Sequence, residues 1–497
     1  MNKKVTVSAA VVVVVAAGLV AAPYVVKSKV KPKFTELQVP QNIADTLAKH
    51  DLAAELKNVS YEDHGLTADT VTRVIVHKEG HPDNKLCFDI SSKLDFGYGT
   101  FYSGNLVKAD SKLLAKSQDP KCGFIDNPAL KYDRGANELF GELFKDGSPL
   151  TATTILNWSG DVNQATINIV PRTLHEPNRR QGEADIFDVK AGQLTISRNS
   201  SHDKVQSKFH WDGFHWQDYS SYKPGVVQAD FTLGAVDSKS SQSRVSDTKY
   251  MWTGTSSIHI APSKFVATNY FASDDGKHET YQLGGINIDF TSSAADKKLT
   301  STMDLKLSDL DIKGSKIANG EAKVTVSNIS TEAMDDLLGI FQENGAFVKA
   351  HGYQRDEILA NKLLSVYQNA KLTLDPVKVE DNGKEISISG SESVGSIDPK
   401  MVQMLGIRGL VLGSAKSLVG DVNLVIDTQM ANKLATTVMS IFAHNPQSLK
   451  HRTERVMRGV TRSLQRQVDA GYLNYDKAAD RYTTKLHIEN GHVKQVK

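Results

Sequence analysis

The chain has 497 residues, of which 40% are hydrophobic and 23% are charged. This length suffices for two or three domains, each with its own core. The 59 basic and 57 acidic residues nearly cancel, so no strong overall field would attract nucleic acid, and we expect no nucleic-acid partner. Two cysteines are too few for a disulfide-rich scaffold or a thiolate zinc cluster.

An uncharged apolar segment lies near the start of the chain. As a helix, Val5–Val26 would span about 33 Å, close to the hydrocarbon thickness of about 30 Å of a bilayer. The alternative is a cleaved signal peptide, because Lys3 and Lys4 precede the segment. Pro23 is unfavourable after a cleavage site, and the apolar run continues beyond it. We therefore expect residues 1–33 to form an uncleaved membrane anchor.

Four lysines follow this segment, at positions Lys27, Lys29, Lys31 and Lys33. They outnumber the two lysines before it, which opposes the rule that positively charged flanks stay in the cytoplasm. Long polar domains behind a single N-terminal signal are exported largely regardless of flanking charge. We therefore expect the body of the protein to lie outside the cytoplasm.

Strand patterns dominate the middle of the chain, after a helical pattern at Pro40–Leu56. β-branched and aromatic residues are concentrated in Val71–Val76, Thr166–Val170 and Ile186–Lys190. Helical patterns are scarce in this region, which favours a long antiparallel meander over alternating strands and helices. The serine-rich segment Asp237–Asp247 has almost no apolar side chain and is predicted to be a loop, either between subdomains or at a hairpin tip.

Two segments in the last third of the chain repeat one pattern. Gly314–Phe341 and Gly413–Phe442 both begin with Gly-Ser and end in a helical stretch. Between these ends each contains a strand, Gly320–Val326 in the first and Gly420–Ile426 in the second. We favour a duplication with a period of about 100 residues. The alternative is two chance matches in a chain rich in serine and valine.

These patterns predict an α+β, β-rich fold. An N-terminal transmembrane helix in residues 1–33 is followed by a long antiparallel meander in residues 34–280. Residues 281–497 then contain the duplicated strand-and-helix units, a basic amphipathic helix and a closing strand. Helices that follow such strands can cover the apolar face of the sheet.

Three places carry a resemblance to a known family. Tyr61–Ala68, with the sequence Tyr-Glu-Asp-His-Gly-Leu-Thr-Ala, is similar to the family's Tyr-x-x-x-Gly-Leu/Phe-Ser/Thr-Ser segment before a first strand. The repeat region is similar in order and spacing, and Gly471–Leu473 with Tyr482–Gly491 resembles the closing pattern. The family is the YdgA/YihF type of bacterial envelope proteins. The resemblance implies an inner-membrane anchor, a periplasmic body and no assigned activity or active-site residues.

A more distant likeness links the chain to AsmA-like envelope proteins. It rests on the repeated amphipathic strands alone. It implies a curved sheet that handles lipid.

An aromatic segment surrounds Asp212-Gly213, a dipeptide that predicts a two-residue hairpin turn. In such a hairpin His210 would oppose His215 on one face of the sheet. Two imidazoles do not make a metal site on their own. We therefore interpret the aromatic pairs as stabilising the hairpin and expect no metal and no cofactor.

A basic amphipathic helix is predicted from Ser448 to Ala470. One side carries an apolar stripe of Val456, Val460, Leu464 and Val468. The other side carries the candidate lipid-contact residues Arg455, Arg458, Arg462 and Arg466. Two interpretations stay open: the arginines contact anionic lipid, or they are the solvated face of a helix that packs on a sheet.

Cys87 and Cys122 are the candidate disulfide. In an oxidising compartment a bond between them would stabilise the fold by about 3 to 4 kcal/mol, because it closes a long loop in the unfolded chain. The alternative is two buried free thiols.

The sequence contains no His-Glu-x-x-His, no Gly-x-Ser-x-Gly, no Walker loop and no dinucleotide fingerprint. We therefore expect no catalytic residues and no enzyme. The leading interpretation is an envelope protein, anchored in the bacterial inner membrane, that binds an apolar ligand such as lipid on a curved sheet. The alternative is a structural or assembly factor that forms homo-oligomers through exposed edge strands.

Overall fold

The computed structural model describes most of the chain from residue 52 to residue 496. The described residues are 44, 47, 52–64, 66–78, 81–96, 100, 103, 105–117, 119, 122–124, 134–157, 162–177, 184–220, 226–269, 277–342, 352–443 and 445–496. The membrane anchor predicted for residues 1–33 lies outside them. Within the described ranges, no helix combines the length and the apolar character that a bilayer crossing requires.

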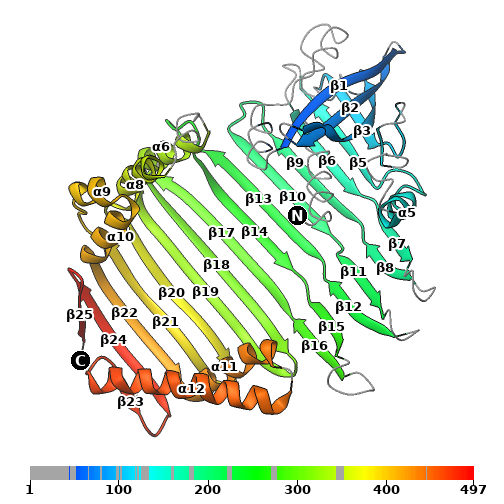
Figure 1. The fold of residues 1–497 in the computed structure, drawn as a ribbon. Coiled ribbons are helices and arrows are strands. Elements are labelled where there is room, and N and C mark those ends of the chain that lie inside the picture. Colours follow the sequence, from blue (N-terminus) through cyan, green and yellow to red (C-terminus); the bar gives the residue numbers. More distant parts are fainter. Residues whose placement is uncertain are drawn as a thin grey trace. The chain divides into compact units, whose positions relative to one another are not determined.

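The chain divides into two compact units, Met1–Lys239 and Ser240–Lys497. Each unit is built mainly from antiparallel strands (Figure 1), so the predicted β-rich antiparallel fold is confirmed at this level. The domain boundaries suggested at residues 33 and 280 stay predictions. Strand β16 (Lys277–Leu283) runs across the second of them.

The first unit contains twelve complete strands and helix α5 among its described residues. The strands expected at Val71–Val76, Thr166–Val170 and Ile186–Lys190 correspond to β2, β6 and β8. The elements are β1 (Leu52–Asp63), β2 (Thr67–Lys78), β3 (His81–Asp95), β4 (Val107–Leu113), α5 (Arg134–Leu143), β5 (Leu150–Leu156), β6 (Val162–Ile169), β7 (Arg172–Pro177), β8 (Ala184–Val189), β9 (Gly192–Arg198), β10 (Lys204–Trp211), β11 (Phe214–Tyr219) and β12 (Val227–Leu233).

Alternate side chains of β2 contribute to the core of this unit. Val74 and Val76 are buried on one face, where four phenylalanine rings gather from different segments. These rings are Phe88, Phe124, Phe140 and Phe144, with neighbouring centroids 5.3 to 5.4 Å apart. On the other face Ile75 contacts the disulfide between Cys87 and Cys122, whose S–S distance is 2.01 Å.

Strands of the first unit bend at a common level. β10 and β11 are two halves of one long strand, because they pair in one unbroken register with β9 and β8. Asp212-Gly213 separates the halves, and Lys190-Ala191 lies opposite. β6 and β7 are interrupted at the same level. The sheet therefore bends along a line that crosses adjacent strands.

The hairpin predicted at Asp212-Gly213 is therefore wrong. Gly213 has a φ of 102°, and a Cβ atom there would lie 2.2 Å from the carbonyl oxygen of Leu233. The Asp212 N–H donates a 2.8 Å hydrogen bond across the bend to the carbonyl of Ala191. The glycine thus supports a bend within a paired strand instead of a chain reversal.

The second unit contains the remaining strands and all described helices except α5. β13 (Val236–Arg244) crosses the division between the units. The other elements are β14 (Trp252–Ile260), β15 (Ser263–Asn269), β16 (Lys277–Leu283), β17 (Gly285–Ala295), β18 (Lys298–Ile312), β19 (Ser315–Ser330), α6 (Thr331–Gln342), α8 (Tyr353–Tyr367), β20 (Lys371–Asp381), β21 (Lys384–Val394), α9 (Pro399–Leu405), α10 (Ile407–Lys416), β22 (Leu418–Asp427), α11 (Thr428–Phe442), α12 (Pro446–Asp469), β23 (Asn474–Asp476), β24 (Arg481–Glu489) and β25 (His492–Gln495).

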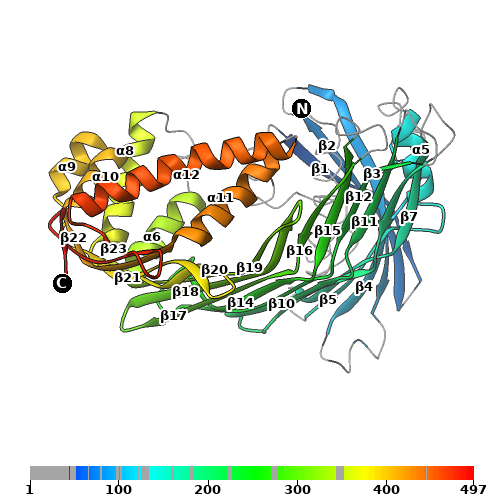
Figure 2. The same ribbon diagram turned by 90° about the horizontal axis from the view of Figure 1, so that it is seen from below.

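The sheet of the second unit bends in the same manner. β14 and β15 pair in one register with β17 and β16, interrupted only by Ala261-Pro262 and by Gly284. The Gly284 N–H donates a 2.9 Å hydrogen bond to the carbonyl of Ser308, so pairing continues across the bend. Figure 2 shows β15 and β16 turned up toward the side of the sheet that carries α11 and α12. The helix-bearing face of this sheet is therefore concave.

Both predicted strand-and-helix segments pass directly from strand to helix. β19 ends at Ser330 and α6 begins at Thr331, and β22 ends at Asp427 and α11 begins at Thr428. The Gly-Ser pairs at their starts differ, because Gly314 lies in a hairpin turn and Gly413 lies in α10. An ancestral duplication stays a prediction.

Two other expectations are wrong. The serine-rich segment forms strand β13 instead of a loop, because small hydroxyl side chains satisfy one another across the sheet. Ser240 shares a 2.9 Å hydrogen bond with Ser256 of β14. The helical pattern before Leu56 also ends earlier than predicted, because β1 begins at Leu52 and pairs with β2.

Candidate functional site

The concave face of the sheet in the second unit is apolar from β14 to β22. Strand alternation and cross-strand register align its side chains in three rows. The first row is Ile258, Ile288, Leu305, Ala322, Val377, Ile388 and Leu424; the second is Phe290, Met303, Val324, Leu374, Gly390 and Val422; the third is Ile260, Ile286, Leu307, Gly320, Val379, Ile386 and Ile426. We call these three rows the apolar face.

The helices cover this apolar face only in part. All of its side chains keep some exposure to solvent, and Ile258, Phe290 and Met303 are each 39% exposed. Figure 1 shows why: α6 and α8 to α10 lie toward one end of the strands and α11 and α12 toward the other. A contiguous apolar surface of this extent is unusual on a soluble protein and marks an interaction site.

Helix α6 closes one end of the apolar face. Its Leu337 and Leu338 pack against a small buried cluster that includes Leu299 of β18 and Ile329 of β19. The start of α6 lies against the sheet because the Thr331 N–H and hydroxyl both donate to the carbonyl of Lys297. This end is therefore a packed core and not part of the open surface.

Charged residues hold α11 at the other end. The side chain of Asp427 is 1% exposed and accepts hydrogen bonds from Arg481 at 3.1 Å and from the Glu385 N–H at 2.8 Å. Burial alone would raise the pKa of Asp427, but these hydrogen bonds and the nearby positive charges hold it below its usual value. Lys433 of α11 also forms an ion pair with Asp381.

Helix α12 packs beside α11 and presents the predicted arginines. The two helices flank a hollow of about 720 Å³ that includes Arg458, Arg462 and Arg466 in its lining, with Asn432 from α11. Arg455 lies outside this hollow and is exposed. Within the described part of the chain, no carboxylate lies within 4.0 Å of any of these four guanidinium groups.

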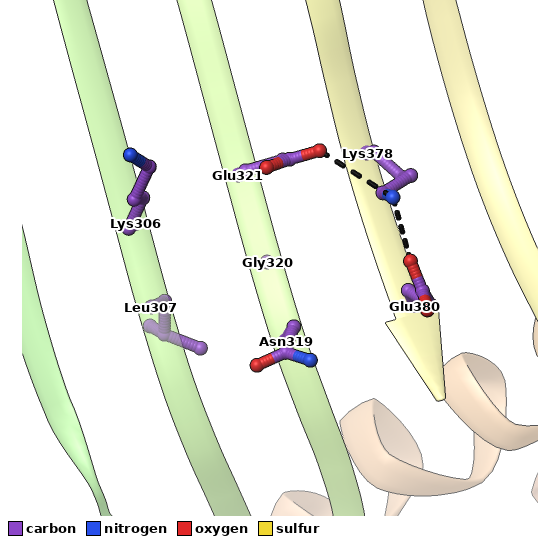
Figure 3. Close-up of a pocket in the computed structure, with 7 residues that line it drawn as sticks. All are labelled: Lys306, Leu307, Asn319, Gly320, Glu321, Lys378 and Glu380. Atoms are coloured by element: carbon purple, nitrogen blue, oxygen red, sulfur yellow. Dashed lines mark ion pairs between the residues drawn. The ribbon is translucent and has the colours of Figure 1, made fainter. Parts of the chain in front are cut away.

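A second, smaller hollow of about 290 Å³ opens on the polar face of the same sheet (Figure 3). Its polar lining consists of Lys306, Asn319, Glu321, Lys378 and Glu380. Lys378 forms ion pairs there with Glu380 at 2.6 Å and Glu321 at 3.5 Å. Hydrogen bonding to Glu380 raises the pKa of Lys378. Because these charges already satisfy one another, this hollow is a weaker candidate than the apolar face.

The histidines of the supposed hairpin do not form a shared site. His210 contacts Asp212 and Asp237, at 2.9 and 2.8 Å, and these hydrogen bonds raise its pKa. His215 contacts Asp230 at 3.3 Å. Among the residues that the structure describes, no group of three or more ligating side chains could hold a metal ion.

Sequence reasoning identified the amphipathic strands and the arginine row but not the uncovered surface. The missed residues include Phe290 and Met303, which pair across β17 and β18. Their alternation is visible in the sequence. Their exposure is not, because it depends on where helices far along the chain come to lie.

One family comparison covers almost the whole chain. Residues 1–494 match the family described as "Bacterial protein of unknown function (DUF945)". Neither curated proteins nor solved structures gave a match.

Proposed function

This chain belongs to the DUF945 family of bacterial proteins of unknown function, and on that premise we propose that its second unit binds the apolar part of a lipid on the apolar face. The observation that carries this proposal is the exposure of Ile258, Phe290 and Met303, which lie toward the β14–β18 end of the apolar rows.

The energetics favour a flexible hydrocarbon chain as ligand. Transfer of apolar surface out of water gains about 25 cal/mol per Å², or about 0.8 kcal/mol per methylene group. An acyl chain that lies along the concave face would cover side chains that the fold leaves partly exposed to solvent. The opposite face carries Lys306, Glu321 and Lys378, and it offers no comparable gain.

The wider setting is also a proposal. We infer that residues 5–26 anchor the protein in the bacterial inner membrane and that the body faces the periplasm. The disulfide between Cys87 and Cys122 supports an oxidising compartment. The finer likeness to YdgA/YihF-type proteins, and the more distant likeness to AsmA-like proteins, agree with this setting. We further propose that the protein acts by binding and not as an enzyme.

A double substitution at exposed positions tests the lipid site. Ile258→Asn with Met303→Gln makes the apolar face polar at two points where little packing is lost. We expect native mass spectrometry of the full chain, extracted in detergent, to show lipid bound to the unaltered protein. The double variant should retain about tenfold less lipid, because about 1.4 kcal/mol of apolar contact is lost.

The matched control places polar changes on the other face of the same strands. Ser257→Asn with Lys306→Gln should leave the bound lipid unchanged, and circular dichroism should show both variants folded. Equal lipid retention by all three proteins, or no lipid on the unaltered chain, would rule out the proposed site.

A further inference from the structure

The second amphipathic surface of this unit is helix α12, which is open to solvent along most of its length. Of its 24 residues only Thr453 is buried. The helix begins at Pro446 behind an N-cap at Asn445, whose side chain accepts a 2.8 Å hydrogen bond from the Ser448 N–H. Its half-buried Leu449, Met457, Leu464 and Val468 face the protein, and most of its remaining surface is open to solvent.

Positive charge dominates this helix. It carries the six cations Lys450, Arg452, Arg455, Arg458, Arg462 and Arg466, against Glu454 and Asp469. Arg458, Arg462 and Arg466 stand four residues apart and form one row. Among the described residues, no carboxylate lies within 4.0 Å of any of the five arginines of this helix, which leaves their charge available to an external anion.

Exposed apolar side chains lie on another side of the helix, beside Arg452 and Arg455. Val456 and Val460 are each 36% exposed. Helical spacing places Arg452 and Arg455 one turn before these valines and places Gly459 and Ser463 next to them on the same side. A Cβ atom at Gly459 would meet nothing within 4 Å. Arg452, Arg455, the two small residues and the two valines therefore make one open surface, which we call the open face of α12.

We infer that the open face of α12 docks on the surface of a bilayer that contains anionic phospholipid. Arginines would contact the phosphate groups, and valines would enter the boundary between headgroups and acyl chains. Basic residues near an anionic leaflet each contribute to binding, and shallow apolar residues add to them. An acidic protein would also match the charge, but it gives no role to the solvent-exposed valines on a smooth surface.

This docking is separate from ligand binding on the apolar face. It would place the second unit against the membrane whether or not that face holds lipid. A test of docking must therefore report on α12 itself, and it must use the full chain in a bilayer.

An environment-sensitive fluorophore on Ser463→Cys provides that report, because the described residues include no free cysteine. The full chain is reconstituted in vesicles of phosphatidylcholine alone or of equal parts phosphatidylcholine and phosphatidylglycerol. We expect a blue shift of the emission only with phosphatidylglycerol. The shift should disappear in about 1 M salt, where the screening length falls to about 3 Å. A label on Lys400→Cys of α9 should not respond.

Charge variants separate docking from a general attraction. Arg452→Gln and Arg455→Gln together should abolish the shift. The control, Lys306→Gln with Lys323→Gln, removes the same charge from the polar face of the sheet and should preserve the shift. Val456→Ser with Val460→Ser should reduce it severalfold.

Three results would overturn the inference. These are an equal shift in vesicles without phosphatidylglycerol, no shift in either vesicle, and equal loss in both charge variants. Lipid retention by the apolar face is measured separately, in detergent. Failure of the docking proposal would therefore not affect the lipid-binding proposal, and the reverse also holds.

Discussion

Asp427 shows how single residues set the limits of the apolar face. It ends β22 and lies directly before α11, so its contacts fix the point at which the sheet gives way to the helix. Arg481 and the Glu385 N–H satisfy its carboxylate from two neighbouring strands. A buried carboxylate without such partners would cost several kcal/mol. The position of α11 over the strand ends therefore depends on this ion pair.

Replacing Asp427 with asparagine should destabilise the second unit by about 2 kcal/mol at neutral pH, because Arg481 loses its charged acceptor. The folded pKa of Asp427 is lowered, so its contribution is complete above the unfolded value of about 3.9 and is lost as the pH falls through the folded value. Urea unfolding of both proteins should therefore converge in acid. Asp421→Asn, at a 72% exposed side chain of the same strand, is the control. A constant difference at all pH values would contradict this linkage.

At the scale of elements, the alternation of apolar and polar residues predicted the strands better than the turns, bends and loops between them. β2 follows directly from its β-branched residues, because one face meets a core. The prediction of a hairpin at Asp212-Gly213 was wrong because a hairpin turn and an in-register bend both use a glycine with positive φ. Only the pairing partners distinguish them, and those come from distant segments. β13 was missed because its serines find hydroxyl partners on β14, which no local pattern reveals.

The bend requires a residue without a side chain at position 213. Gly213→Ala should destabilise the first unit by about 3 kcal/mol or more, because the methyl group would lie 2.2 Å from the Leu233 carbonyl oxygen. Gly147→Ala has a similar φ of 99° but open space around it, so it should cost only about 1 kcal/mol. Urea denaturation measures both. Equal losses would mean that backbone strain alone, and not the close approach at the bend, requires the glycine.

On the scale of the whole molecule, the candidate site was only half visible in the sequence. Helical spacing places Arg458 and Arg462 in one row, and strand alternation places apolar residues on one sheet face. Whether a row meets carboxylates, and whether a face meets helices, depends on long-range packing. The incomplete cover of the apolar face and the open face of α12 are both consequences of tertiary structure, and both lie in the second unit.

The two units have separate cores, and this separation can be tested through the disulfide. The buried clusters around Phe88 and around Cys87 and Cys122 belong to the first unit, whereas those around Met251 and Ile397 belong to the second. Cys87 and Cys122 are 35 residues apart, and opening a loop of that size should cost about 3 to 4 kcal/mol.

We therefore expect the double variant Cys87→Ser, Cys122→Ser to speed hydrogen exchange throughout the core of the first unit. Exchange in the strands β17 to β22 should not change, because their buried contacts are made within the second unit. Mass spectrometry of peptides from both units measures this in one experiment. Faster exchange in both units would show that the chain unfolds as one cooperative body. Unchanged exchange in both would show that the bond contributes nothing to the first core. The expected split would mean that the lipid-binding properties proposed for the second unit survive reduction of the disulfide, so lipid retention by the variant should equal that of the unaltered chain.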